Sequence, residues 1–194
     1  MTRGHVLDGW RIDITVRPGV PRVMSGIAAA RVVAAALAAA GAPKPATLSV
    51  ILTDDAELAE LNEAHLGHEG PTDVLSFPLA PPGAYPPHLG SETRDGPVAA
   101  AADAMAGAPP VPFVLPPRTR PHLGDIAISV ERAIAQASDG RGGQTGDVRW
   151  SASQELRLLL VHGALHVCGW DHAEPPEEAA MRALERRVLG GSTA

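Results

Sequence analysis

The 194-residue sequence predicts a single α+β domain, in which a mixed sheet of about four strands packs against four to five helices. Two patterns predict this class. Short stretches with the composition of strands are interspersed with longer stretches that carry helical signals. The composition is also 45% apolar, which is enough for a core. We therefore expect one domain, residues 1–194, with a histidine-bearing helix near its C-terminal end.

The first half of the chain predicts two strands and two helices. Residues 10–16 (WRIDITV) alternate apolar and polar side chains, which indicates a half-buried strand. Residues 21–40 are alanine-rich and stop at a glycine, which is typical of a helix end. A second strand is expected over 46–52. Residues 53–55 then offer side-chain oxygens that can cap a helix ending near Gly67.

The second half continues the alternation. Residues 74–77 and 123–129 are short apolar runs and are predicted to be strands. Residues 131–138 are predicted to form a helix after the second of these strands. A long leucine-rich helix is expected over 151–168, where serines can cap its start and a glycine follows its end. Prolines and glutamates suit the first turn of a last amphipathic helix over 175–189.

The segment between these halves has a different composition. Residues 81–117 are rich in proline, alanine and glycine and show no regular period. A proline every few residues removes backbone donors and breaks helices. We therefore expect an insertion or flexible loop at about 81–117.

Charge and composition exclude several classes of protein. The net charge of −6 argues against a generally basic nucleic-acid-binding protein, although residues 1–50 hold six basic against two acidic groups. A lone cysteine, Cys168, excludes an intramolecular disulfide and suits a reducing compartment. No segment has the length and composition of a membrane span or a signal peptide. We expect a cytoplasmic protein that does not associate with membranes.

Three histidines near the C-terminal end predict a metal site. His162 and His166 are four residues apart, so a helix places both rings on one face. Gly169 then ends the helix, and the chain can fold back to bring His172 to the same point. Three imidazoles and one water form an open tetrahedral site for one ion, which we expect to be Zn²⁺, although nickel and cobalt also suit such ligands. The alternative is a hydrogen-bonded histidine cluster without metal.

This segment and two others resemble a known family. Residues 162–172 (HGALHVCGWDH) match the pattern His-Gly-x-Leu-His-x-x-Gly-(Tyr/Trp)-Asp-His of the YbeY family of bacterial rRNA maturation factors. Residues 71–78 (PTDVLSFP) and 123–129 (LGDIAIS) resemble the other motifs of that family, in the same order. The resemblance covers about residues 10–80 and 120–190.

The resemblance implies an activity and its partners. It implies a metal-dependent endoribonuclease specific for single-stranded RNA, which acts in 16S rRNA 3′-end maturation and ribosome quality control at the small ribosomal subunit. It also implies that His162, His166 and His172 are zinc ligands. The ion would polarise a phosphoryl oxygen and activate water, either as the nucleophile or as a base toward the 2′-hydroxyl.

Further residues are candidates for supporting roles. The catalytic candidates are carboxylates of the motifs, namely Asp73, Asp125 and Asp171. Asp73 could instead cap a turn, and Asp125 could be an ordinary strand-edge residue. Glu155, Asp125 and Asp171 are also candidates for orienting a ligand imidazole. The candidates for holding the RNA strand are basic residues of the first half: Arg17, Arg22 and Arg31.

Two departures from known patterns bear on the choice between functions. The glutamate that serves metalloproteases as a base follows the first histidine of their motif, and here that position is Gly163, so proteolysis is disfavoured. The family also tends to carry an arginine where this chain has Leu66, flanked by His65 and His68. Without a guanidinium there, one alternative is a zinc-containing ribosome-assembly factor with little nuclease activity. A weaker alternative is another zinc-dependent hydrolase.

Overall fold

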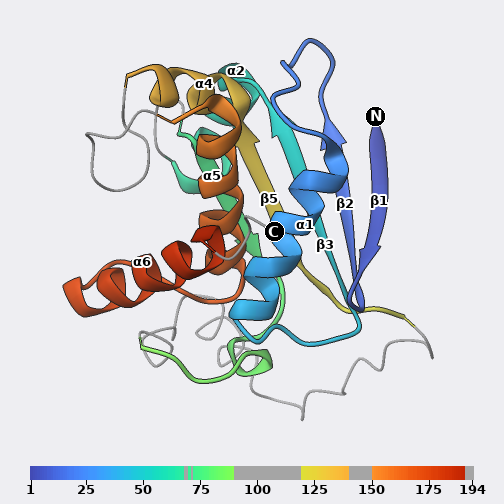
Figure 1. Ribbon diagram of the computed structural model, residues 1–194, viewed down its shortest axis with the longest axis vertical. Coiled ribbons are helices and arrows are strands. Elements are labelled where there is room, and N and C mark those ends of the chain that lie inside the picture. Colours follow the sequence, from blue (N-terminus) through green and yellow to red (C-terminus); the bar gives the residue numbers. More distant parts are fainter. Residues whose placement is uncertain (68–69, 71, 90–118, 140–149, 191–194) are drawn as a thin grey trace.

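A five-stranded mixed sheet organises the computed structural model, which describes residues 1–67, 70, 72–89, 119–139 and 150–190 (Figure 1). The three central strands run parallel, and each edge strand runs antiparallel to its neighbour. In spatial order the strands are β1 (Thr2–Leu7), β2 (Trp10–Val16), β3 (Ala46–Thr53), β5 (His122–Ser129) and β4 (Val74–Pro78).

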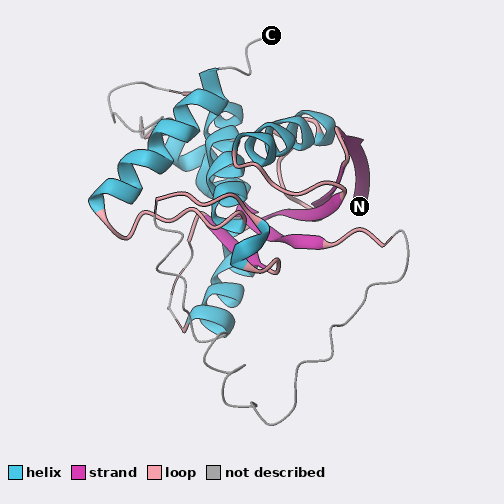
Figure 2. Ribbon diagram, turned by 90° about the horizontal axis from the view of Figure 1, so that it is seen from below, coloured by secondary structure: helices cyan, strands magenta, loops and turns pink. Residues whose placement is uncertain are grey.

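Helices cover the two faces of the sheet unequally, as Figure 2 shows. The helical elements are α1 (Gly26–Ala39), α2 (Asp55–Leu66), the 3₁₀ turn η1 (Pro82–Ala84), α4 (Val130–Ser138), α5 (Ala152–Val167) and α6 (Pro175–Gly190). The main core lies between the sheet and helices α1 and α5, and α6 adds buried side chains to it. On the other face α2 forms a smaller cluster, in which Leu58 packs with Leu75 and Ala127.

Helix α5 lies very close to the sheet because it carries a glycine at the point of contact. A Cβ atom at Gly163 would lie 2.8 Å from Ile126 Cγ2 and 3.1 Å from Val74 Cγ2. The Ser76 hydroxyl also donates to the Gly163 carbonyl at 3.1 Å. These contacts fix the rotation of α5 on strands β4 and β5, and thereby the direction of the adjacent His162.

The α+β class of the sequence prediction is confirmed, but the sheet has one strand more than expected. The strand that the sequence did not predict is β1. It is an edge strand with mostly exposed side chains and no apolar alternation that could predict it. Its order comes from antiparallel pairing with β2. The first helix begins at Gly26, where Ser25 caps it, and not at residue 21.

The start of the predicted 81–117 insertion packs on the domain. The amides of Leu79 and Ala80 donate to the Leu123 carbonyl at 2.9 and 3.2 Å, and Tyr85 is buried. Residues 90–117 lie outside the described part of the chain. Among the described residues, no helix is long and apolar enough to cross a membrane.

Candidate metal centre

The chain reverses its direction directly after the C-terminal end of α5. Gly169 adopts a positive φ of 96°. Its N–H donates to the His166 carbonyl, and the Trp170 N–H donates to the Leu165 carbonyl, both at 3.0 Å. These two bonds form a Schellman motif, which satisfies the last carbonyls of a helix while reversing the chain. The reversal places the next residues beside the final turn of α5.

His162 is oriented by a buried carboxylate from the last helix. Its Nδ1 lies 2.8 Å from Oε1 of Glu185, whose side chain is only 4% exposed. A carboxylate accepts hydrogen bonds, so Nδ1 carries the proton in this contact. Nε2 of His162 therefore keeps its lone pair in the neutral ring.

His166 is oriented in the same way by the backbone. Its Nδ1 lies 2.9 Å from the Trp170 carbonyl oxygen, which can only accept, so Nδ1 is again the protonated nitrogen. The Nε2 atoms of His166 and His162 are 3.0 Å apart. Two lone pairs at this distance repel each other unless a proton or a metal cation lies between them.

His172 completes a group of three. The Asp171 carboxylate accepts the His172 backbone N–H at 2.7 Å, which stabilises the turn that brings His172 back. The His172 ring centroid lies 5.4 Å from that of His162 and 5.1 Å from that of His166. One nitrogen from each ring lies within 4.8 Å of the other two.

The donor set fits a metal ion better than it fits a shared proton. Metal-bound histidines almost always donate the remaining ring N–H to a carboxylate or a backbone carbonyl, as His162 and His166 do here. Two nitrogens bound to tetrahedral zinc stand about 3.3 Å apart, close to the observed Nε2 separation. A proton shared between His162 and His166 would give no reason for the His172 ring to lie beside them. The three histidines could therefore hold a metal ion.

Burial keeps the His166 ring neutral. Removal of the His166 ring from water, together with the positive charges of His162 and His172, lowers its pKa from 6.5 to about 4, against smaller opposing effects of Asp171 and of the Trp170 carbonyl. A neutral imidazole is the form that binds a metal. His166 thus stays ready for coordination across the neutral pH range.

The supporting carboxylates predicted from the sequence do not all lie here. Asp171 adjoins the three histidines through its bond to His172 and its charge effect on His166. Glu155 is buried in the first turn of α5, seven residues before His162 and therefore about 10 Å away along the helix axis. Their catalytic or orienting roles stay predictions.

Asp73 anchors the start of β4. Its carboxylate accepts from the Gln136 side chain on α4 at 3.0 Å and from the Thr72 hydroxyl at 3.4 Å, and its carbonyl accepts from the Ser129 N–H. These bonds agree with the turn-capping role considered for it, and its catalytic role stays a prediction.

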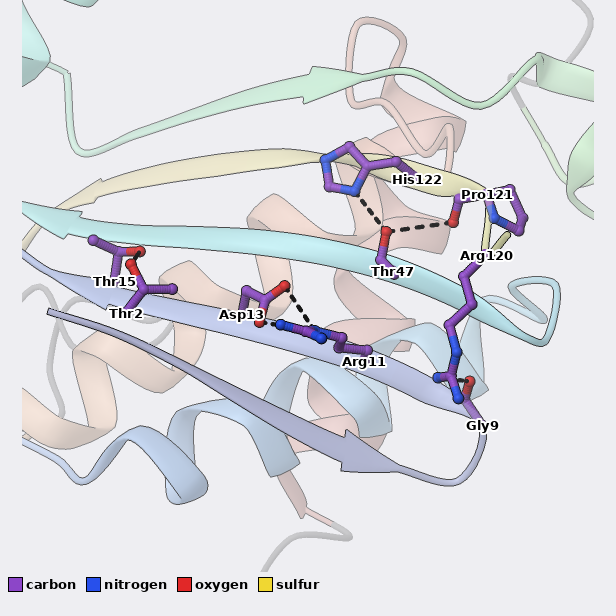
Figure 3. A network of polar contacts seen from close by, with 9 residues as sticks. All are labelled: Thr2, Gly9, Arg11, Asp13, Thr15, Thr47, Arg120, Pro121 and His122. Carbon is purple, nitrogen blue, oxygen red and sulfur yellow. Dashed lines mark hydrogen bonds and ion pairs between the residues drawn. The ribbon is translucent and has the colours of Figure 1, made fainter. Parts of the chain in front are cut away.

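Asp125 belongs to a polar network on the opposite face of the sheet. It follows a bulge in β5 and precedes Ile126, which points toward α5. Its carboxylate lies 3.0 Å from His122 Nε2, and His122 Nδ1 lies 2.9 Å from the Thr47 hydroxyl. Figure 3 shows His122 and Thr47 beside the Arg11–Asp13 ion pair. A cavity of about 480 Å³, lined in part by Thr47 and His122, lies over this face. Because neighbouring side chains of a strand point to opposite faces and Ile126 points toward α5, the sheet separates Asp125 from the histidines.

Two of the predicted RNA-holding arginines, Arg17 and Arg22, lie at the other end of the sheet from the last turn of α5. The Arg17 amide donates to the Leu52 carbonyl near the end of β3, and its guanidinium pairs with Glu57. Arg22 lines a cavity beside Arg17. The last turn of α5 instead contacts Gly124, near the start of the parallel strand β5. Arg31 is exposed on α1.

Glu185 was not predicted from the sequence, although its position in α6 carries a signal. The buried side chains of α6 include Met181, Leu184 and Val188, which follow the apolar spacing of an amphipathic helix. Glu185 occupies a position within this stripe, where a charged side chain needs a buried partner. That partner is His162, which no local pattern on α6 identifies.

The fold and this centre define a class of protein: an α+β domain that presents three histidines, from one helix end and the turn after it, to a common point. The chain belongs to the YbeY endoribonuclease family, since the family profile described as "Endoribonuclease YbeY" matches residues 24–192. This result confirms the family resemblance of the sequence motifs.

Relatives from several bacteria carry the same name, "Endoribonuclease YbeY". That of Roseiflexus castenholzii is 34% identical over 180 residues, which are 92% of this chain and 91% of the relative. That of Salinispora tropica is 40% identical over 149 residues, covering 77% and 76%. Among solved structures, the solution structure of TM1509 from Thermotoga maritima is similar over 92% of this chain and 90% of its own, with 17% identity and a TM-score of 0.47, which is too distant to bear on function.

The lowered pKa of His166 predicts a pH-dependent loss of stability in metal-free protein. The unfolded state takes up a proton near pH 6.5 and the folded state only near pH 4, so stability is retained above about pH 6.5 and falls as the pH drops toward 4. Each pKa unit between the states corresponds to about 1.4 kcal/mol. Urea unfolding in a chelator should show a shallower pH dependence for His166→Gln. An equal dependence in both proteins would contradict the assigned cause.

Proposed function

We propose that this chain is a zinc-dependent endoribonuclease for single-stranded RNA that acts in 16S rRNA 3′-end maturation and ribosome quality control. The observation that carries the proposal is the pair of facing Nε2 atoms, 3.0 Å apart, with His172 beside them. The names of the relatives support RNA as the substrate. Association with the small ribosomal subunit in the cytoplasm belongs to the same proposal.

Each residue of the centre has a definable task. His162, His166 and His172 would hold the zinc ion, while Glu185 and the Trp170 carbonyl keep the protons of the first two rings on Nδ1. A bound zinc ion supplies Lewis acidity, which polarises a phosphodiester oxygen and activates water near neutral pH. Asp171 is our candidate for accepting the proton released during cleavage, because it adjoins the histidines.

Proteolysis is disfavoured by packing as well as by sequence. At Gly163, where metalloproteases carry their glutamate, even a Cβ atom would come within 3.1 Å of side chains on both β4 and β5. A glutamate there would have to displace α5 from the sheet. A metalloprotease, which is one form of the weaker alternative of another zinc-dependent hydrolase, would therefore lack its usual base.

Loss of one ligand should abolish cleavage. We expect His166→Ala to lower the cleavage rate of a single-stranded RNA oligonucleotide by more than about 100-fold, since loss of a supporting residue alone costs 10–100-fold. His5→Ala, which alters a histidine of edge strand β1, serves as the matched control and should keep the wild-type rate. Zinc content should be measured on the same preparations.

Two outcomes would contradict the enzyme proposal in different ways. Equal residual cleavage by wild-type protein and His166→Ala would identify the nuclease as a contaminant. Wild-type protein that contains zinc but does not cleave would favour the alternative of a zinc-containing ribosome-assembly factor.

The charge on Glu185 should raise metal affinity. We expect Glu185→Gln to bind zinc about 10-fold more weakly, because the neutral amide is a poorer acceptor for the Nδ1 proton of His162. Glu177→Gln is a matched control, since Glu177 is also buried on α6 but accepts the Glu174 amide instead. Competition with a chelating dye measures both affinities, and equal values would show that Glu185 is not an orienting partner.

A further inference from the structure

A fourth histidine lies one contact away from the three-histidine centre. The His88 ring stacks on the Trp170 indole, with 4.3 Å between ring centroids and 10° between ring planes. His88 follows β4 in the chain and is not a member of the group that could hold the ion. Its stack on Trp170 connects it to the centre.

Trp170 needs such a contact because no hydrogen bond fixes its ring. Its indole Nε1 is buried and has no hydrogen-bond partner among the described residues. The ring packs against the main core, and His88 stacks on it. The backbone carbonyl of the same residue accepts the Nδ1 proton of His166 at 2.9 Å. Movement of the indole would therefore shift the acceptor that orients His166.

His88 is itself carried by a well-packed segment. Leu79 and Ala80 donate to the Leu123 carbonyl, and Tyr85 is 7% exposed in the main core. Pro86 lies against the end of α1, where a Cβ atom at Gly41 would come within 2.7 Å of its Cγ. The backbone that carries His88 is therefore held in place by its packing on the domain.

We infer that His88 is a positioning residue of the metal centre: its ring holds Trp170 in place, so that the Trp170 carbonyl keeps His166 Nε2 directed at the ion. This inference rests on the proposed metal centre. It also makes the segment before residue 90 a part of the support of that centre, although the sequence predicts only a loose insertion there.

The test compares the zinc affinity of three His88 variants. We expect His88→Ala and His88→Leu to weaken zinc binding about 10-fold, and His88→Phe, which keeps an aromatic face, to remain within about 2-fold of wild type. His65→Ala is the matched control, because it removes a comparable ring contact, with Phe77, on the opposite face of the sheet. The absorption spectrum of the Co²⁺-substituted proteins reports ligand geometry and should change for alanine and leucine only.

Circular dichroism of the metal-free proteins identifies any variant that does not fold. Zinc affinities and Co²⁺ spectra are then compared among the folded variants only. Wild-type affinity and spectrum in the folded alanine or leucine variant would overturn the inference. A phenylalanine variant as weak as these would overturn the stacking role. Wild-type protein that binds no zinc would instead overturn the proposed metal centre, so the two failures are distinguishable.

Discussion

The hydrogen bonds from His162 Nδ1 to Glu185 and from His166 Nδ1 to the Trp170 carbonyl are the interactions on which the rest of the site depends. Each bond decides which nitrogen of its ring carries the proton. Together they leave two lone pairs facing each other at 3.0 Å, an arrangement that a cation stabilises. His172 then adds a third ring from outside the helix.

The fold supplies these acceptors from separate parts of the chain. Gly163 lets α5 approach the sheet, and Gly169 lets the chain reverse at the end of that helix. Helix α6 packs with its apolar stripe buried, and this packing places the Glu185 carboxylate beside the His162 ring. Because a side chain on a packed element moves little, ligands built in this way are held close to their productive geometry.

The histidine spacing and the glycine after it were sufficient to predict which three rings meet, because both signals are local to one helix and its cap. The α+β class followed from periodicity. Strand β1 could not be predicted, since its order comes from pairing with β2 and not from its own side chains. Glu185 and His88 reach the centre through tertiary packing, and the separation of Asp125 from it depends on a bulge in β5 that changes which face its side chain occupies.

Crystals grown with zinc, and measured on both sides of the zinc absorption edge, would test the central claim most directly. The account predicts one anomalous peak, bound by Nε2 of both His162 and His166 at about 2.0–2.1 Å, with His172 as the third ligand. Nδ1 coordination by either helix histidine, or an ion bound elsewhere with the three rings unliganded, would contradict it.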